Sequence, residues 1–152
     1  MIEVGSRAPS FGGRDQKGAE LRSETLLGRG PIVLYFYPRD FTPGCTREAC
    51  LFRDAFDELQ GLGASIVGVS VDDGESHRRF AERHGLPFSL LSDPDRAIAR
   101  AYGIVRPLGL GARRVTFVID RGGIVRGAFH SELSMSAHLK GVRATLGALA
   151  PG

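Results

Sequence analysis

The segment from Tyr35 to Cys50 reads YFYPRDFTPGCTREAC, and the expected architecture is organised around it. The apolar run at residues 32–37 stops at Pro38, which has no N–H for a sheet and fixes its own φ. A turn-rich segment follows, and Cys45 then opens a helical pattern. The N-terminus of a helix offers free N–H groups and the positive end of the helix dipole, so a thiol placed there ionises more easily. Because the thiolate is the reactive form, we expect Cys45 to carry the chemistry.

The second cysteine stands at a spacing that suggests a redox pair. Apolar residues recur at helical spacing along the expected helix 46–59 and define a buried stripe of Ala49, Phe52, Phe56 and Leu59. Cys45 lies on this stripe, whereas Cys50 lies roughly 140° around the helix. Their Cα atoms would be about 8.6 Å apart, beyond the roughly 7 Å limit for a disulfide. The two sulfurs can therefore join only if the first turn and a half of the helix unwinds.

A longer motif around these cysteines resembles a known family. Pro38, Thr42 and Cys45 match the Pro-x-x-x-Thr-x-x-Cys signature of the peroxiredoxins. The run Thr-Pro-Gly-Cys-Thr-x-Glu-Ala-Cys is similar to the bacterioferritin comigratory protein, or peroxiredoxin Q, branch, and the resemblance extends from residues 5–11 to residues 114–120. It implies a thioredoxin-like α/β fold with an N-terminal strand or hairpin extension, and a thiol peroxidase activity.

The remaining sequence alternates between strand and helix patterns. Strands are expected at residues 32–37, 64–71, 88–91, 115–119 and 124–129, and helices at residues 46–59, 75–84, 95–102 and 135–149. Before residue 27 we expect a short strand or hairpin with a returning edge strand. This order indicates an α/β fold with a mixed sheet flanked by helices. The chain has 152 residues, of which 42% are apolar, so we expect a single domain over residues 1–152.

The resemblance also assigns roles to residues around the reactive cysteine. Thr42 would hold a peroxide through its hydroxyl or cap the helix, and Pro38 would pack over the sulfur or simply end the strand. Arg114 would bring a guanidinium to the thiolate, and Arg113 would take its place if the strand slipped by one residue. Glu48 resembles the family's acid that orients this arginine, and it is also a favourable acid in the first turn of a helix.

Cys50 is the expected resolving thiol of the cycle that the resemblance implies. A peroxide substrate oxidises Cys45 to a sulfenic acid, Cys50 condenses with it to an intramolecular disulfide, and thioredoxin or a similar dithiol reductant regenerates the pair. Cys50 could instead be a bystander, with an external thiol resolving a one-cysteine cycle. A peroxide-sensing switch that captures a partner is the alternative from another class. A disulfide reductase is disfavoured because those proteins use Cys-x-x-Cys.

Composition limits the possible partners. Lys and Arg total 20 for a net charge of +3, but these residues are scattered among acids rather than forming a block, so we expect no nucleic-acid partner. No apolar run approaches the roughly 20 residues that span a bilayer, so we expect no membrane partner. Residues 1–5 do not begin a secretory signal, which makes the cytoplasm the expected location.

No cofactor or metal is expected. No second Cys or Cys/His pair stands at zinc-ligand spacing. We assign no role to the four histidines and expect His77 and His84 at the surface. A monomer is expected, but the short apolar segment 104–112 departs from the longer polar loop of the family and leaves oligomeric state and peroxide preference open.

Overall fold

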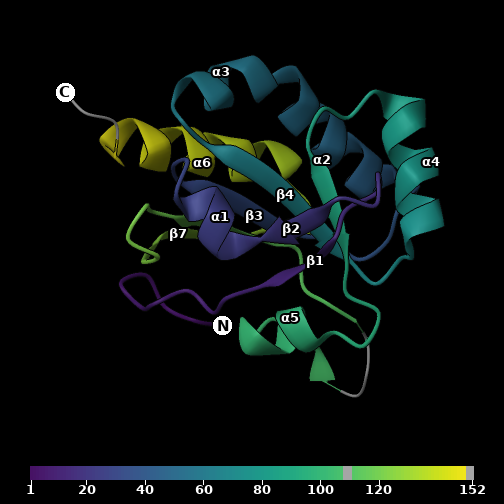
Figure 1. Cartoon of the computed structure of the whole chain (residues 1–152), viewed down its shortest axis with the longest axis horizontal. Coiled ribbons are helices and arrows are strands. Elements are labelled where there is room, and N and C mark those ends of the chain that lie inside the picture. The colour runs from purple at the N-terminus through teal and green to yellow at the C-terminus, as the bar shows by residue number, and fades with distance from the viewer. Residues whose placement is uncertain (108–110, 150–152) are drawn as a thin grey trace.

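The computed structural model describes residues 1–107 and 111–149 and is built on a five-stranded mixed sheet (Figure 1). The strands are β3 (Ile32–Phe36), β4 (Ser65–Ser70), β5 (Ser89–Ser92), β6 (Val115–Ile119) and β7 (Val125–His130). They lie in the order β5-β4-β3-β6-β7, with β3, β4 and β5 parallel and β6 antiparallel to both β3 and β7. A separate antiparallel hairpin contains β1 (Gly12–Arg14) and β2 (Glu20–Arg22). The predicted mixed α/β sheet with an N-terminal hairpin is confirmed.

Helices cover both faces of this sheet (Figure 1). They are α1 (Ser23–Leu27), α2 (Pro43–Asp54), α3 (Phe56–Gly61), α4 (Gly74–His84), α5 (Ala97–Ala101) and α6 (Met135–Leu149). Helices α2, α3, α4 and α6 pack on one face, and the hairpin, α1 and α5 on the other. Alternate residues of β3 enter opposite cores, with Tyr35 on the first face and Phe36 on the second. β3 reads as a continuous apolar run because it is buried on both sides.

The prediction of a single helix at residues 46–59 is wrong in two respects: the helix begins earlier, and it is interrupted in its middle. α2 begins at Pro43, because proline at the first helical position lacks only an N–H that has no intrahelical partner. It ends at Asp54, and Ala55, at φ −92° and ψ 1°, separates it from α3. Asp57 and Glu58 lie in the first turn of α3, where acids favour a new helix N-terminus.

The helix expected at residues 95–102 is shorter than predicted. α5 begins at Ala97, after Arg96 in the left-handed region at φ 59°. The Asp93 carboxylate accepts hydrogen bonds from the backbone N–H groups of Ile98 and Ala99, at 3.0 and 2.9 Å. The N-terminal donors of α5 are therefore satisfied from outside the helix, which begins three residues after Pro94. By contrast, α4 is capped by the side chain of Asp73, which accepts from the N–H of Ser76 at 2.8 Å, and α6 has the predicted bounds.

The apolar segment 104–112 is paired at both of its ends. Val105 and Ala112 form an isolated antiparallel bridge, and the N–H of Arg106 donates to the carbonyl of Gly111 at 2.7 Å. Residues 108–110, which belong to the segment singled out in the sequence, lie outside the described residues. Within residues 1–107 and 111–149, no helix has the length and apolar character needed to cross a membrane.

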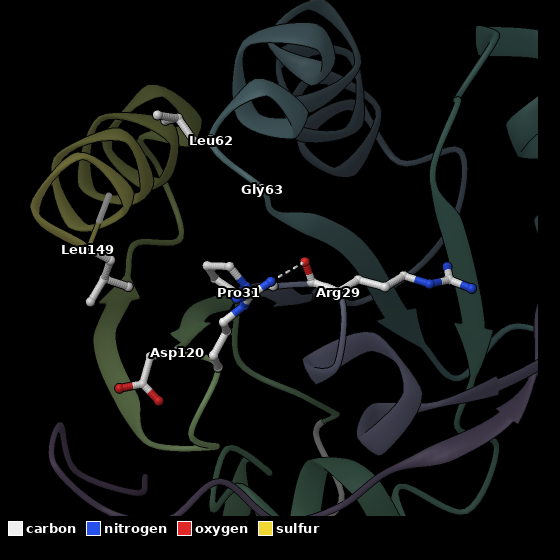
Figure 2. A pocket seen from close by; sticks show the side chains of 8 residues that line it. Arg29, Pro31, Leu62, Gly63, Asp120 and Leu149 are labelled. Atoms are coloured by element: carbon white, nitrogen blue, oxygen red, sulfur yellow. Dashed lines mark hydrogen bonds between the residues drawn. The ribbon is translucent and has the colours of Figure 1, made fainter. Parts of the chain in front are cut away.

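An apolar hollow of about 420 Å³ opens at the N-terminal end of β3 (Figure 2). Its lining residues are Arg29, Gly30, Pro31, Leu62, Gly63, Asp120, Arg121 and Leu149. It contains no thiol or imidazole, and its one carboxylate, that of Asp120, accepts from Arg126 at 2.6 Å and from a backbone N–H. Cys45 follows the opposite, C-terminal end of β3, so this hollow is not the candidate site.

Candidate active site

Cys45 lies in the first turn of α2, just beyond the C-terminal end of β3. Thr42 takes the N-cap position, and Cys45 is the third residue of the helix after Pro43 and Gly44. N–H groups of a first helical turn lack intrahelical partners and carry the positive end of the helix dipole, which favours an anion. The side chain is also withdrawn from solvent, at 1% exposure. The local sequence therefore places a shielded sulfur where a thiolate is stabilised.

A guanidinium from a distant strand lies beside this sulfur. Nη1 of Arg114 donates to Sγ of Cys45 at 3.3 Å and to Oε1 of Glu48 at 3.2 Å. Arg114 immediately precedes β6, and the structure places this arginine, not Arg113, at the sulfur. Burial opposes the charge of the guanidinium, but Cys45 and Glu48 outweigh burial and raise the pKa of Arg114. Arg114 therefore stays charged against the sulfur.

Glu48 is a buried acid one turn after the cysteine, with 1% exposure. Burial raises its pKa to about 7, although the nearby Arg114 acts in the opposite direction. Its Oε1 is bound to Arg114, whereas its Oε2 has no hydrogen-bond partner among the described residues. The carboxyl can thus take up or lose a proton close to neutral pH near the Cys45 sulfur.

Glu132, which the sequence did not single out, holds Arg114 from the other side. Its Oε1 accepts from the backbone N–H of Arg114 at 3.1 Å and from Nη2 of Arg106 at 2.6 Å. Its Oε2 lies 4.0 Å from Nε of Arg114. Glu132 sits in the connection between β7 and α6, and no local pattern marks it, because its partner is 18 positions away in sequence.

Thr42 and Pro38 line one hollow of about 290 Å³ near the start of α2. The hydroxyl of Thr42 donates to the carbonyl of Arg39 at 3.0 Å and makes no hydrogen bond to the helix N-terminus. The alternative in which its side chain caps the helix is therefore wrong, although Thr42 is the N-cap residue by backbone position. Its half-buried hydroxyl is left facing the loop, where it can rotate toward a ligand.

Cys50 lies on the half-buried side of α2, away from Cys45, and both cysteines are free thiols. Its Sγ lies 4.0 Å from Nδ1 of His84 at the end of α4. Nη1 of Arg53 donates to the carbonyl of His84 at 2.8 Å and ties the same stretch of α2 to α4. Because α2 is continuous from Pro43 to Asp54, the two sulfurs can meet only after local unwinding.

The histidines differ from expectation. His77 and His138 are completely buried, so the expected surface placement of His77 is wrong, whereas His84 is half-buried and its Nδ1 lies 4.0 Å from the Cys50 sulfur. His138 lies four positions before Val142 on the apolar stripe of α6, a spacing that could have indicated its burial. A histidine within an apolar stripe enters the core with that stripe.

His77 of α4 belongs to a second buried cluster, which it forms with Tyr37 and Asp40 of the loop after β3. Its Nδ1 lies 2.7 Å from Oδ2 of Asp40, which also accepts from Ser76 at 2.8 Å, while Oδ1 of Asp40 accepts from Tyr37 at 2.5 Å. Asp72 completes a group with ligand-type atoms within 4.8 Å of one another. The Asp40 oxygens are already paired with side-chain partners, so we assign this cluster to fixing the loop before α2 rather than to a metal.

Comparison with known proteins agrees with the geometry of the site. Residues 4–128 match the AhpC/TSA family. Peroxiredoxin Q, chloroplastic, of Oryza sativa subsp. japonica is 39% identical over 139 residues, covering 91% of this chain and 64% of that protein. The chain thus spans just under two thirds of the length of the first plant relatives it matches. A putative peroxiredoxin bcp of Coxiella burnetii is 40% identical over 130 residues, covering 82% of this chain and 85% of that protein.

Solved structures agree over nearly the whole chain. Peroxidoxin BcpB of Mycobacterium tuberculosis superposes with a TM-score of 0.94 at 40% identity, covering 99% of this chain and 100% of that one. A bacterioferritin comigratory protein of Xanthomonas campestris superposes with a TM-score of 0.84 at 33% identity, covering 93% and 92%. The predicted thioredoxin-like fold is confirmed. The chain belongs to the AhpC/TSA family, in its peroxiredoxin Q or bacterioferritin comigratory protein branch.

Proposed function

We propose that this protein is a thiol peroxidase that reduces hydrogen peroxide and organic hydroperoxides through Cys45. The observation that carries the proposal is the hydrogen bond of 3.3 Å from Arg114 Nη1 to the Cys45 sulfur at the start of α2. Two positive influences, a guanidinium and a helix N-terminus, then favour the thiolate. The bacterioferritin comigratory protein of X. campestris, to which the chain is similar, has alkyl peroxide reduction activity, which supports this choice of substrate.

In the oxidation step, the Cys45 thiolate attacks one oxygen of the peroxide. A sulfur–oxygen bond forms while the O–O bond breaks, and the leaving hydroxide or alkoxide takes a proton to become water or alcohol. Arg114 stays bound to the sulfur and the substrate oxygen as negative charge moves from one to the other, and Glu48 orients it. The Thr42 hydroxyl, beside Pro38 in the hollow before α2, holds the peroxide. The product on the enzyme is a Cys45 sulfenic acid.

In the resolving step, the Cys50 thiol attacks the sulfenic sulfur of Cys45. The disulfide bond forms, and the hydroxyl group leaves with the thiol proton as water. The start of α2 must unwind for this step, because the two residues lie on different sides of one continuous helix. Thioredoxin or a similar dithiol then reduces the disulfide by exchange and becomes oxidised in turn.

The need to regenerate the two thiols indicates the cellular compartment in which the protein would act. Regeneration requires a compartment that maintains reduced dithiols, so the cytoplasm is the proposed location. We also propose that the protein acts as a monomer with one domain over residues 1–152. It would need no prosthetic group and would bind neither nucleic acid nor a membrane.

The experiment that tests the proposal is peroxide-dependent oxidation of reduced thioredoxin. The parent protein should turn over, and Cys45→Ser should abolish turnover. Turnover that survives Cys45→Ser would refute the peroxidase. Cys50→Ser should react once with peroxide, stop at the sulfenic acid and lose turnover with thioredoxin. If Cys50→Ser turns over as fast as the parent, the resolving thiol is external.

A further inference from the structure

His138 completes a chain of contacts that begins at the reactive sulfur. From Cys45 the chain runs through Arg114 to Glu48, and the Glu48 oxygen that Arg114 leaves free, Oε2, lies 3.5 Å from Nδ1 of His138. His138 and Glu48 have 0% and 1% exposed side chains, so water does not screen this pair. Nothing in the oxidation step above uses the histidine.

The ring nitrogens of His138 have separate partners, and these define its protonation. Nε2 lies 2.9 Å from the backbone carbonyl of Ser131, which can only accept, so Nε2 carries a hydrogen. Nδ1 lies 2.8 Å from the hydroxyl of Thr116, which can either donate or accept. Whether Nδ1 also carries a hydrogen is therefore not decided by Thr116. It depends on the carboxyl on the other side.

One proton is needed between Glu48 and His138. Without it, Nδ1 has no hydrogen to donate, and the unpaired carboxylate oxygen of Glu48 faces it in a site closed to water, which is an unfavourable arrangement. With it, either the carboxyl or the imidazole carries the proton, and Oε2 is compensated in both forms. Burial raises the pKa of Glu48 to about 7 and lowers the pKa of His138, so the two groups compete for a proton near neutral pH.

We propose that His138 is a positioning residue of the peroxidase reaction, which shares one proton with Glu48 and so keeps the charge of Arg114 available to the Cys45 thiolate. With the proton, the pair is neutral as a unit, and the thiolate and the guanidinium balance each other. Without the proton, Glu48 adds a second negative charge to the same guanidinium and disfavours the thiolate. The inference rests on the proposed role of Cys45 as the nucleophile.

Other charged groups near His138 also influence its protonation. Arg114 lowers the pKa of the imidazole and Glu132 raises it, while His130 lowers it. Glu132 is itself bound to Arg106 at 2.6 Å and lies 3.3 Å from His130. The side chains of Arg106, His130 and Glu132 are 38%, 41% and 32% exposed, whereas Glu48 is 1% exposed and faces the ring from within α2. Glu48 is therefore the group whose proton the histidine controls most directly.

The test is the thiolate titration of Cys45, followed by ultraviolet absorbance in a Cys50→Ser background. His138→Gln retains an amide N–H for Ser131 but cannot take up a proton. It should raise the thiol pKa by about one unit. The pH profile of the rate constant for peroxide should shift by the same amount, with its plateau at high pH unchanged. Adding Glu48→Gln to His138→Gln should reverse most of the shift. Lys140→Gln, an exposed change on the same helix, is the matched control and should leave the titration unchanged.

Several outcomes would overturn the proposal. They are an unchanged titration in His138→Gln, a lowered plateau without a shift, and a shift that Glu48→Gln does not reverse. If His138→Gln does not fold, NMR of the His138 ring in otherwise unaltered protein decides. The ring signals should respond to ionisation of Cys45 and lose that response in Cys45→Ser, and an identical titration in both proteins would refute the coupling. Failure of the peroxidase itself would appear separately, as peroxide turnover that survives Cys45→Ser.

Discussion

Nη1 of Arg114 lies 3.3 Å from Sγ of Cys45, although the two residues are 69 positions apart in the sequence. The contact exists because β6 is the antiparallel neighbour of β3, with Val115 opposite Phe36. The residue before β6 is thereby brought to the end of β3 from which the chain enters α2. The pairing of β6 with β3 thus places the guanidinium of Arg114 beside the Cys45 sulfur at the N-terminus of α2.

Replacing Arg114 should therefore impair Cys45 directly. Arg114→Gln removes the charge and the hydrogen bond, so the pKa of the thiol should rise and the rate constant for peroxide at pH 7 should fall by about 100-fold or more. Arg114→Lys keeps the charge but not the planar guanidinium. Its rate constant for peroxide should lie between those of the parent protein and Arg114→Gln. The matched control is Arg113→Gln, for which a change within about twofold is expected, since its side chain is not placed at the sulfur. Equal losses in the two positions would contradict the assignment.

Gly44 should be sensitive to a single methyl group. A Cβ at this position would lie 3.1 Å from Nη2 of Arg114, closer than nearly all contacts of real Cβ atoms. Gly44→Ala should push the guanidinium from the sulfur and slow the reaction with peroxide by about tenfold, with little loss of stability because alanine favours a helix. Stopped-flow kinetics and thermal melting measure the two effects. Gly61→Ala, which meets no atom within 4 Å, should leave the kinetics unchanged.

Glu48 should make the free energy of unfolding fall as pH rises. Its pKa is raised from 4.5 to about 7 by burial, so between these values the folded protein binds more protons than the unfolded chain. The cost is absent below pH 4.5 and fully present above about pH 7, where the shift corresponds to about 3 kcal/mol. Urea denaturation of the reduced parent protein and of Glu48→Gln, at a series of pH values, measures this cost in the free energy of unfolding. The stability of the parent relative to the variant should decline across this window, and a constant difference would show that Glu48 ionises freely.

His84 should affect the second step of the cycle and not the first. Its Nδ1 lies 4.0 Å from the Cys50 sulfur, and burial, together with Arg83 and Arg53, lowers its pKa, so a neutral imidazole is available to accept the thiol proton. His84→Ala should slow disulfide formation by about threefold to tenfold at neutral pH while leaving sulfenic acid formation unchanged. Rapid chemical quench followed by mass spectrometry of the two thiols separates the two phases. A slower first phase instead would place His84 elsewhere in the reaction.

Gly30 should be intolerant of any side chain. A Cβ at this position would overlap the backbone carbonyl of Gly63, which cannot move without displacing the start of β4. Gly30→Ala should lower the free energy of unfolding by about 2 kcal/mol or more. Gly74→Ala meets no atom within 4 Å and serves as the control in the same denaturation experiment. Equal stability of the two variants would mean that the chain relaxes at no cost.

Some of the fold and of the site follows from local sequence alone. β3 is buried on both faces because every residue from Ile32 to Phe36 is apolar or aromatic. Cys45 lies at a helix N-terminus because Pro43 favours the first helical position. The family resemblance added Arg114 and Glu48, and the structure brings Arg114 to the sulfur and Glu48 to Arg114.

The tertiary structure alone decided which polar side chains surround the site. Glu132 binds Arg114 because β7 pairs with β6, with His130 opposite Val115, and His138 faces Glu48 because α6 packs against α2 and β6. No spacing along the chain encodes either contact. The contact of His84 with Cys50 arises in the same way, from the packing of α4 beside α2. Local sequence specifies the direction in which a side chain leaves its own element. What that side chain meets depends on the packing of elements that are distant in sequence, and this packing also determines burial and hence protonation.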